Sequence, residues 1–376
     1  MDFAFTEEQT LLRNSISQFV TDNYTFETFK KISRSEPGWN RDYWRQFAEL
    51  GLLAASLPEE YGGLGGGPVE TMIVMEEFGR ALIVEPYAAT VVVGGGFLVN
   101  GGSEAQKREW LPKIARGETV ISFAHAEPRG RYNFADLSTT AISQGSGYLL
   151  NGYKAVVIGA PWADMLIVTA RTAGGRRDKN GISVFLVDKE SKGISARDYP
   201  TVDGLRASEI TFENVEVPGS NVLGAVDNGL KLIEQVTDAA IAAHAAEAVG
   251  AMKVLLDATV EYSKTRKQFG VPIGKFQVLQ HRMVDMFINY EQSKSITYMA
   301  TLKLGDGEVE RKKAASAAKV QIGKAGRFIG QNAIQLHGGM GMTDELDVGH
   351  YFKRLTMLDT LYGNVDHHLK RYASLG

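Results

Sequence analysis

The stretch Arg266-Lys-Gln-Phe-Gly270, followed by Ile273-Gly-Lys-Phe-Gln277, decides the fold of this chain. It interrupts a helical hydrophobic pattern that covers residues 227–376. One long alanine-rich helix is predicted before it, from residue 230 to about residue 268, and Pro272 just beyond cannot continue a helix. The C-terminal part is therefore predicted to be a bundle of long helices with a short connection near Phe269.

Two other patterns precede this bundle. Apolar residues recur at helical spacing from Thr6 to about Gly117, and Thr6 followed by Glu7 and Glu8 is a typical helix start. Short β-rich runs separated by Gly, Asn and Asp clusters come next and predict an all-β sandwich or barrel. The predicted fold is α+β and multidomain, with an N-terminal helical domain (residues 1–118), a middle β domain (119–226) and a C-terminal helical bundle and oligomerisation domain (227–376).

Composition narrows the class of protein. The 376 residues are 44% apolar and 23% charged, as in ordinary globular proteins, and a net charge of -3 gives no electrostatic reason to bind nucleic acid or a membrane surface. The absence of cysteine excludes disulfides and thiolate metal sites, and we expect no metal. The N-terminus has no signal-peptide pattern, and no apolar run approaches the roughly 20 residues that span a bilayer. We therefore expect a cytoplasmic protein without nucleic-acid or membrane partners.

Several motifs follow one another in a characteristic order. Besides the two quoted above, they are Leu57-Pro-Glu-Glu-Tyr-Gly-Gly63, Gly204-Leu-Arg-Ala-Ser208 with Phe212-Glu-Asn-Val-Glu-Val-Pro218, and Gln335-Leu-His-Gly-Gly-Met-Gly341. Together they resemble the acyl-CoA dehydrogenase family over essentially the whole chain. More closely, the chain resembles the small subunit of two-component members such as pimeloyl-CoA dehydrogenase, which pair two unlike homologous chains.

The resemblance implies a C-terminal four-helix bundle, FAD as the cofactor and α,β-dehydrogenation of an acyl-CoA thioester as the reaction. It implies a homologous subunit as partner, in a tetrameric hetero-oligomer, or else further copies of this chain. It also implies an electron-transfer flavoprotein as the electron acceptor. The pathway would be degradation of fatty acids or of steroid side chains, and no residue decides which acyl-CoA is the substrate.

The C-terminal motifs have the chemistry that the adenosine-diphosphate end of FAD needs. The guanidinium of Arg266 matches phosphate oxygens, and the glycine pair would let the backbone approach the dinucleotide. The alternative is that Arg266 is a cation at a helix C-terminus and the glycines form a turn. By resemblance, the cofactor-binding residues are Arg266, Gln268, Phe269, Ile273, Phe276, Gln277, Gln335, Gly338 and Gly339.

The other half of the cofactor site departs from the family pattern. A threonine that usually contacts the flavin ring is replaced by Ala126, in Ala126-Glu127-Pro128. On a second flavin-facing strand, Val156 stands for an aromatic residue and Ile158 for a hydroxyl residue. Each lost hydroxyl removes a hydrogen bond to the flavin, worth about 0.5–1.5 kcal/mol. The ring half of the flavin pocket is therefore expected to be degraded.

The catalytic base is also absent from its usual positions. In most of the family a glutamate follows the tyrosine at 362, and some members carry it on the long helix; here the residues are Gly363 and Ala240. The candidates for a relocated base are Asp366, His367 and His244. Glu247 shares the helix face of Ala240 but lies about 10 Å further along the axis. The alternative is that His244 is a packed helix residue and the C-terminal candidates are solvated.

Three hypotheses follow. The first is a subunit of an FAD-dependent acyl-CoA dehydrogenase that lacks its own catalytic glutamate and shares an FAD site with a homologous partner. The second is a self-sufficient homo-oligomeric acyl-CoA dehydrogenase with a relocated base at Asp366, His367 or His244. The third is a structural paralogue without flavin. The intact Arg266 and Gln335 motifs favour the first hypothesis over the third.

Overall fold

The computed structural model describes residues 4–376, which form two compact units. Unit 1 contains the described residues up to Lys31, together with Pro68–Ile83 and Ile241–Gly376. Unit 2 contains Ile32–Gly67 and Val84–Ala240. The border between the units therefore falls inside one helix, α7 (Gly229–Thr265). The three-domain borders that the sequence suggests stay a prediction.

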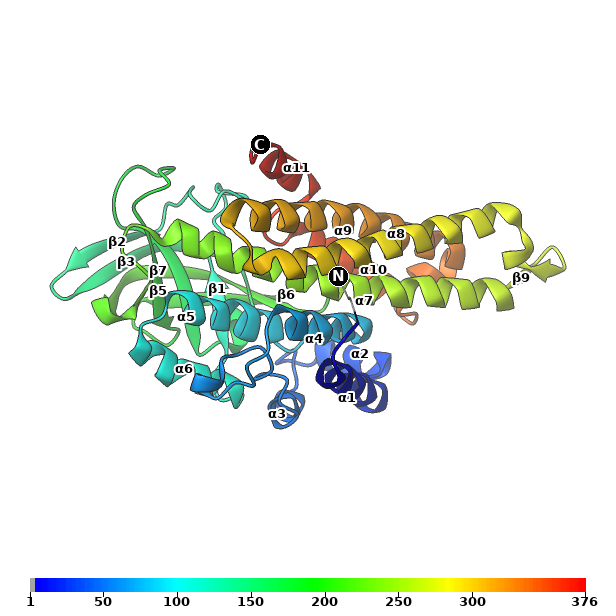
Figure 1. Cartoon of the computed structure of the whole chain (residues 1–376), viewed down its shortest axis with the longest axis horizontal. Coiled ribbons are helices and arrows are strands. Elements are labelled where there is room, and N and C mark those ends of the chain that lie inside the picture. Colours follow the sequence, from blue (N-terminus) through cyan, green and yellow to red (C-terminus); the bar gives the residue numbers. More distant parts are fainter. Residues whose placement is uncertain (1–3) are drawn as a thin grey trace. The chain divides into compact units, whose positions relative to one another are not determined.

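Unit 1 is helical. Within it α8 and α9 pack side by side, and α10 and α11 pack on α9 (Figure 1). This arrangement confirms the predicted C-terminal four-helix bundle. Thr6 caps α1, as predicted, because its hydroxyl accepts from the amide of Gln9 at 3.2 Å and the Gln9 side chain accepts from the Thr6 amide. The helices with residues in this unit are α1 (Glu7–Asn23), α2 (Phe26–Arg34, to Lys31), α4 (Pro68–Ala81), α7 from Ile241, α8 (Gln277–Leu302), α9 (Glu308–His337), α10 (Val348–Thr360) and α11 (Val365–Ala373).

The helices α4 and α7 cross in backbone contact. A Cβ atom on Gly250 would lie 2.0 Å from the carbonyl oxygen of Glu76, and one on Gly79 would lie 2.0 Å from that of Glu247. Neither position can carry a side chain unless the helices separate. The alanines of α7 permit similarly close packing around this crossing, and those from Ala240 to Ala251 are almost completely buried.

By length and composition α7 could cross a membrane, and it is the one helix among residues 4–376 that passes this test. However, 83% of its apolar window is buried inside the structure. Its apolar composition is therefore explained by packing in the protein core.

Helix α7 ends three residues before the predicted end near residue 268. The reason is a two-residue turn at Phe269 and Gly270, where φ is +54° and +81°. This turn joins β9 (Lys267–Gln268) to β10 (Val271–Pro272) in a small antiparallel hairpin. The hairpin lies at one end of the long helices (Figure 1).

Unit 2 is built on one mixed sheet of eight strands in the order β6-β7-β3-β2-β4-β5-β8, with β1 parallel to β4. The sheet confirms the predicted middle β domain. Strands β4 and β5 are buried almost throughout, as is typical of continuous apolar runs. The strands are β1 (Ile121–Ala124), β2 (Thr140–Gln144), β3 (Gly147–Ile158), β4 (Met165–Arg171), β5 (Ile182–Asp188), β6 (Ile194–Pro200), β7 (Arg206–Pro218) and β8 (Val222–Leu223). The helices wholly in this unit are α3 (Arg41–Glu49), α5 (Gly95–Gly101) and α6 (Glu104–Ala115).

The crossing of α4 and α7 gives a prediction for stability. We expect Gly250→Ala to lower the free energy of unfolding by about 1–3 kcal/mol, because its Cβ would meet the Glu76 carbonyl. In an open helix the same change would stabilise the protein by roughly 0.5–1 kcal/mol. The control is Gly305→Ala, whose Cβ would have no heavy atom within 4 Å. Urea unfolding measures both variants, and equal stabilities would contradict the close crossing.

Candidate functional site

The two C-terminal motifs lie at the same end of unit 1. The Tyr262 hydroxyl donates to the carbonyl of His337 at 3.4 Å, and the two rings lie 4.4 Å apart between centroids. Arg266 follows Tyr262 by one helical turn, and Gln335 precedes His337 by two residues. Because the contact joins the ends of α7 and α9, residues about 70 positions apart in the sequence come to the same place.

The β9–β10 hairpin displays an aromatic side chain. Phe269 has a left-handed backbone conformation and its side chain is 93% exposed, with only an edge contact to Phe276 at 6.1 Å between centroids. A left-handed conformation costs a residue with a Cβ roughly 1–2 kcal/mol. Among residues 4–376, the edge contact with Phe276 is the one ring contact seen for Phe269, so the exposed ring gains little packing in return. Ile273, by contrast, is buried, so its side chain packs inside unit 1.

The polar and glycine residues of the two motifs are open to solvent. Gln268, Gln277 and Gln335 are exposed, and a Cβ on Gly338 or Gly339 would meet no heavy atom within 4 Å. Gly338 has a positive φ of +62°, which favours glycine. No contact with the described part of the chain demands glycine at 339. The open space before this backbone fits a dinucleotide that must approach it closely.

In unit 2 a buried ion pair holds the segment that begins at Ala126. The Lys154 ammonium, which is fully buried, lies 2.9 Å from Glu127 Oε1 and donates to Thr169 at 3.0 Å. Burial lowers the pKa of Lys154 to about 8, and the Glu127 carboxylate opposes this shift. Burial acts to raise the pKa of Glu127, but Lys154 and hydrogen bonds from Ser138 and Thr139 leave it below its usual value.

Two residues of the expected ring-binding half have unusual surroundings. Val156 is 46% exposed and has a φ of +51°, at a register shift between β3 and β7. A β-branched residue is strained in that conformation. The amide of Ala155 donates to the carbonyl of Ala126 at 2.8 Å, which ties the two segments together. Ile158 is half-buried.

The space beside Gly363 is already filled. A Cβ on this residue would lie 2.5 Å from His367 Cδ2 and 2.7 Å from His368 Nε2, and φ is +119°. The His368 ring is fixed because Nε2 donates to the Tyr362 carbonyl at 3.1 Å and Nδ1 lies 3.3 Å from Ser316 Oγ. A side chain at 363 would therefore displace two histidines.

The C-terminal base candidates have structural explanations. Asp366 is exposed in the first turn of α11, where a carboxylate is stabilised by the helix dipole. His367 is half-buried, and its amide donates to the capping side chain of Asn364 at 3.0 Å. Burial, with Arg371 and Lys370 nearby, lowers the pKa of His367. Ala240, which occupies the alternative base position on α7, is buried.

His244 belongs to a buried polar group that sequence reasoning missed. Its Nδ1 lies 2.8 Å from Glu247 Oε2, and the other carboxylate oxygen accepts from Arg354 Nη1 at 2.6 Å. Arg354 also donates to the carbonyl of Ile83 at 3.1 Å. Burial acts to raise the pKa of Glu247, but Arg354 and His244 outweigh it and hold this pKa at about 2. Because the carboxylate is ionised, Nδ1 must donate to it, which leaves Nε2 as the basic atom of the ring.

The His244 ring also lies beside the residue that precedes Gly363. The centroids of His244 and Tyr362 are 6.1 Å apart. Glu247 and Arg354 are 107 positions apart and no motif links them, so only the packing of α7 against α10 reveals the pair.

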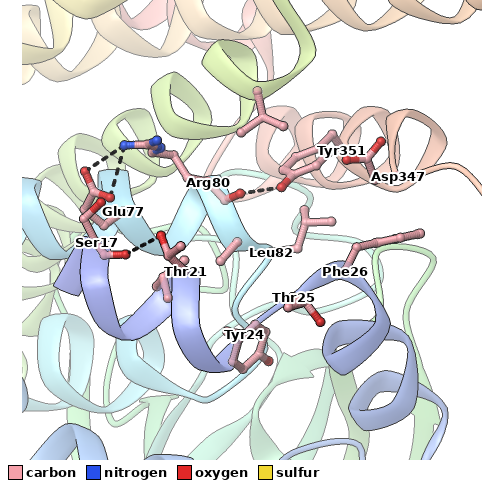
Figure 2. A pocket seen from close by; sticks show the side chains of 13 residues that line it. Ser17, Thr21, Tyr24, Thr25, Phe26, Glu77, Arg80, Leu82, Asp347 and Tyr351 are labelled. Carbon is pink, nitrogen blue, oxygen red and sulfur yellow. Dashed lines mark hydrogen bonds and ion pairs between the residues drawn. The ribbon is translucent and has the colours of Figure 1, made fainter. Parts of the chain in front are cut away.

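Figure 2 shows a cavity of about 270 Å³ in unit 1 that contains none of the predicted site residues. Several of its polar groups contact one another. Arg80 bridges both carboxylate oxygens of Glu77 at 3.3 Å, and the Arg80 carbonyl accepts from the Tyr351 hydroxyl (Figure 2). Arg13 also pairs with Glu77, at 3.3 Å. The cavity therefore lies where polar groups of α1, α4 and α10 meet.

Known proteins match the whole chain. Family models for the N-terminal, middle and C-terminal domains of acyl-CoA dehydrogenase match residues 6–118, 122–215 and 227–374. A probable acyl-CoA dehydrogenase of Bacillus subtilis, YngJ, is 32% identical over 96% of this chain and 95% of its own length. Subunit CarC of the caffeyl-CoA reductase-Etf complex of Acetobacterium woodii is 31% identical, covering 93% of each chain. In the ChsE4-ChsE5 complex from Mycobacterium tuberculosis, one chain superposes with a TM-score of 0.90 at 25% identity, covering 100% of this chain and 98% of that one.

The filled space at residue 363 gives a second prediction. We expect Gly363→Glu to lower the unfolding midpoint and to cost about 1–3 kcal/mol, because the new side chain must displace His367 and His368. Gly376→Glu is the control, since that glycine also has a positive φ but no neighbouring atom within 4 Å of its Cβ. A Gly363→Glu variant as stable as the control would show that the space is open.

A third prediction concerns acid. Burial lowers the pKa of His368 to about 3, below its unfolded value of about 6.5, so the folded state binds fewer protons between these values. The stabilisation from neutral His368 is therefore complete above pH 6.5 and is lost as the pH falls towards 3. We expect the loss of stability in His368→Gln to shrink between pH 7 and pH 4. His281→Gln, at an exposed site on α8, should follow the wild type. A pH-independent difference would contradict the shift.

Proposed function

Because the chain belongs to the acyl-CoA dehydrogenase family, we propose that it is a subunit of an FAD-dependent acyl-CoA dehydrogenase that shares its FAD site with a homologous partner. One observation carries the proposal, the contrast between the two halves of the site. The Arg266 and Gln335 end is displayed to solvent, whereas the position of the usual base, Gly363, is filled by histidines. This contrast is what we expect of a chain that holds one part of an FAD site while another chain supplies the rest.

The displayed residues have distinct expected roles toward the cofactor. The guanidinium group of Arg266 would bind the diphosphate, and the side-chain amides of Gln268 and Gln335 would supply hydrogen bonds. Phe269 would pack on the adenine, and the open backbone at Gly338 and Gly339 would accept close approach. When bound, FAD supplies the acceptor for the hydride that leaves the substrate β-carbon.

An exposed apolar face on α8 supports the proposal that the chain binds a partner subunit. Val284, Phe287 and Ile288 on α8 are 54%, 52% and 45% exposed. They adjoin a groove of about 490 Å³ between α7 and α8 whose apolar lining includes Val260 and Met283. Contiguous exposed apolar surface of this kind is typical of protein interfaces. We propose that it contacts a homologous acyl-CoA dehydrogenase subunit, within a tetramer, or a second copy of the chain.

Further parts of the proposal rest on family membership. The oxidising partner would be an electron-transfer flavoprotein, and the complex would act in the cytoplasm on an acyl-CoA from fatty acid or steroid side-chain degradation. The small-subunit assignment and the pimeloyl-CoA likeness belong to this proposal as well.

A specific observation favours a second candidate function. Among the three possible relocated bases, only His244 is oriented by a buried carboxylate, at 2.8 Å from Glu247. A histidine paired with a carboxylate is a common arrangement for a general base. In a self-sufficient enzyme, His244 would take the α-proton of the substrate through Nε2.

The first experiment tests the shared site. The tagged chain is purified from its native host, and a co-purifying homologue is sequenced for a Tyr-Glu motif. In that complex we expect Arg266→Gln and Phe269→Ala each to weaken FAD retention by tenfold or more, measured by flavin absorbance. A hydrogen bond to a charged group and the burial of a phenylalanine side chain are each worth about 1.5–3 kcal/mol. Arg282→Gln, at an exposed position on α8, should not change it. Stoichiometric FAD and acyl-CoA oxidation by the chain alone would contradict sharing.

The second experiment tests the alternative base. If the purified chain oxidises an acyl-CoA by itself, His244→Gln should lower kcat by a factor of about 100 or more. His281→Gln serves as the matched histidine control. Unchanged turnover in His244→Gln would exclude His244 as the base.

A further inference from the structure

The cavity of about 270 Å³ in unit 1 has an arginine at one side and a carboxylate at the other. In Figure 2, Arg80 of α4 lies at one side and Asp347, just before α10, lies at the opposite side. Apolar residues such as Val20 and Leu82 also line the cavity. Pockets for drug-sized ligands measure about 300–1,000 Å³, so a ligand of this cavity is smaller than these.

Arg80 has hydrogen-bond donors to offer a ligand. Its Nη1 contacts both carboxylate oxygens of Glu77 at 3.3 Å, and Glu77 is also paired with Arg13 at 3.3 Å. Among residues 4–376, no hydrogen bond is seen from Nε or Nη2 of Arg80. The Arg80 side chain is 41% exposed, whereas that of Glu77 is 2% exposed. Because Arg13 also compensates the charge of Glu77, the outer donors of Arg80 suit the carboxylate of a ligand.

Asp347 supplies a negative charge at the opposite side. Burial raises the pKa of its carboxyl group, although backbone amides and two nearby histidines oppose this shift. The aromatic residues Phe26 and Tyr351 line the same side of the cavity (Figure 2). Aromatic rings attract organic cations through their faces, and a carboxylate adds to this attraction. This side of the cavity therefore suits an ammonium group.

The neighbouring cations are paired with other carboxylates. In the part of the chain that the structure describes, no ion pair is seen for Asp347. His350 pairs with Asp344, at 3.0 Å. The Lys30 ammonium, which lies over an aromatic ring of the same side, pairs with Glu27 at 2.6 Å. An ammonium group from a ligand would therefore give Asp347 an ion pair that the described residues do not provide.

We propose that this cavity binds a small amino acid in its zwitterionic form. The carboxylate accepts from the outer donors of Arg80, and the ammonium group lies beside Asp347. A simple carboxylate would leave Asp347 without a cation, and a simple amine would leave the outer donors of Arg80 without an anion. The exposed residues Thr21 and Thr25 line the cavity, so a ligand can enter from solvent. The inference does not rest on the FAD site, because none of the residues proposed to bind FAD lines this cavity.

Calorimetry on the full-length chain tests the proposal. The ligands are glycine, 3-aminopropanoate, 4-aminobutanoate and L-valine, and butanoate and butylamine are the analogues with a single charge. We expect at least one amino acid to bind tenfold or more tightly than both analogues, because it gains a second charge-assisted hydrogen bond. The same amino acid should raise the unfolding midpoint, since it binds the folded chain.

Two substitutions separate the two sides. Asp347→Asn should bind the amino acid no more tightly than the wild type binds butanoate, and Arg80→Gln no more tightly than it binds butylamine. Asp285→Asn and Arg282→Gln, at exposed positions on α8, are the matched controls.

The proposal is wrong if no amino acid of the panel binds the wild type, or if butanoate or butylamine binds it as tightly as the amino acids do. It is also wrong if Asp347→Asn binds the amino acid like the wild type. The first two outcomes use the wild type alone, so they decide the question even where a variant does not fold.

Discussion

The structure of unit 1 depends on the backbone contact between α4 and α7. Glycines at 79 and 250 let the two helices approach until carbonyl oxygens occupy the places of side chains. This closeness buries Glu247, whose charge is compensated by His244 on the same helix and by Arg354, which reaches it from α10. The guanidinium also bonds to the carbonyl of Ile83 just beyond α4, so one ionic group joins three segments. The position of α10, and with it of the Tyr362–Gly363 turn, follows from this arrangement.

The two ends of the bundle serve different purposes. At the Gly363 end, polar groups are buried and satisfied by one another, as in the interior of a structural protein. Six residues at the hairpin end face solvent although no contact with the described residues requires it. They are the strained Phe269, the glutamines Gln268, Gln277 and Gln335, and the glycines Gly338 and Gly339. Exposed apolar side chains and strained backbone dihedrals are characteristic of binding surfaces, because their free-energy cost is offset only when a complex forms. The contrast supports a chain that binds rather than one that performs the whole reaction.

Much of this could be predicted from the sequence, and particular residues show where prediction stops. Thr6 and the apolar runs of β4 and β5 carry local signals, so the α1 start and both strands were foreseeable. Strand β6 is largely exposed and polar, with no alternation to mark it. The end of α7 was misplaced because the turn at Phe269 uses a positive φ that phenylalanine seldom adopts. The partner of Glu247, Arg354, lies 107 positions away in the sequence, and only tertiary packing brings the two together.

The histidines around Gly363 also bear on how this chain can change over generations. A glycine codon can become a glutamate codon by a single nucleotide substitution, so a glutamate at this position is one mutation away. Here the new side chain would collide with rings that are themselves fixed by Ser316 and by the Tyr362 carbonyl. A glutamate at 363 therefore needs both histidines to move as well. The packing around residue 363 is therefore itself a barrier to any side chain at this position, whatever its chemistry.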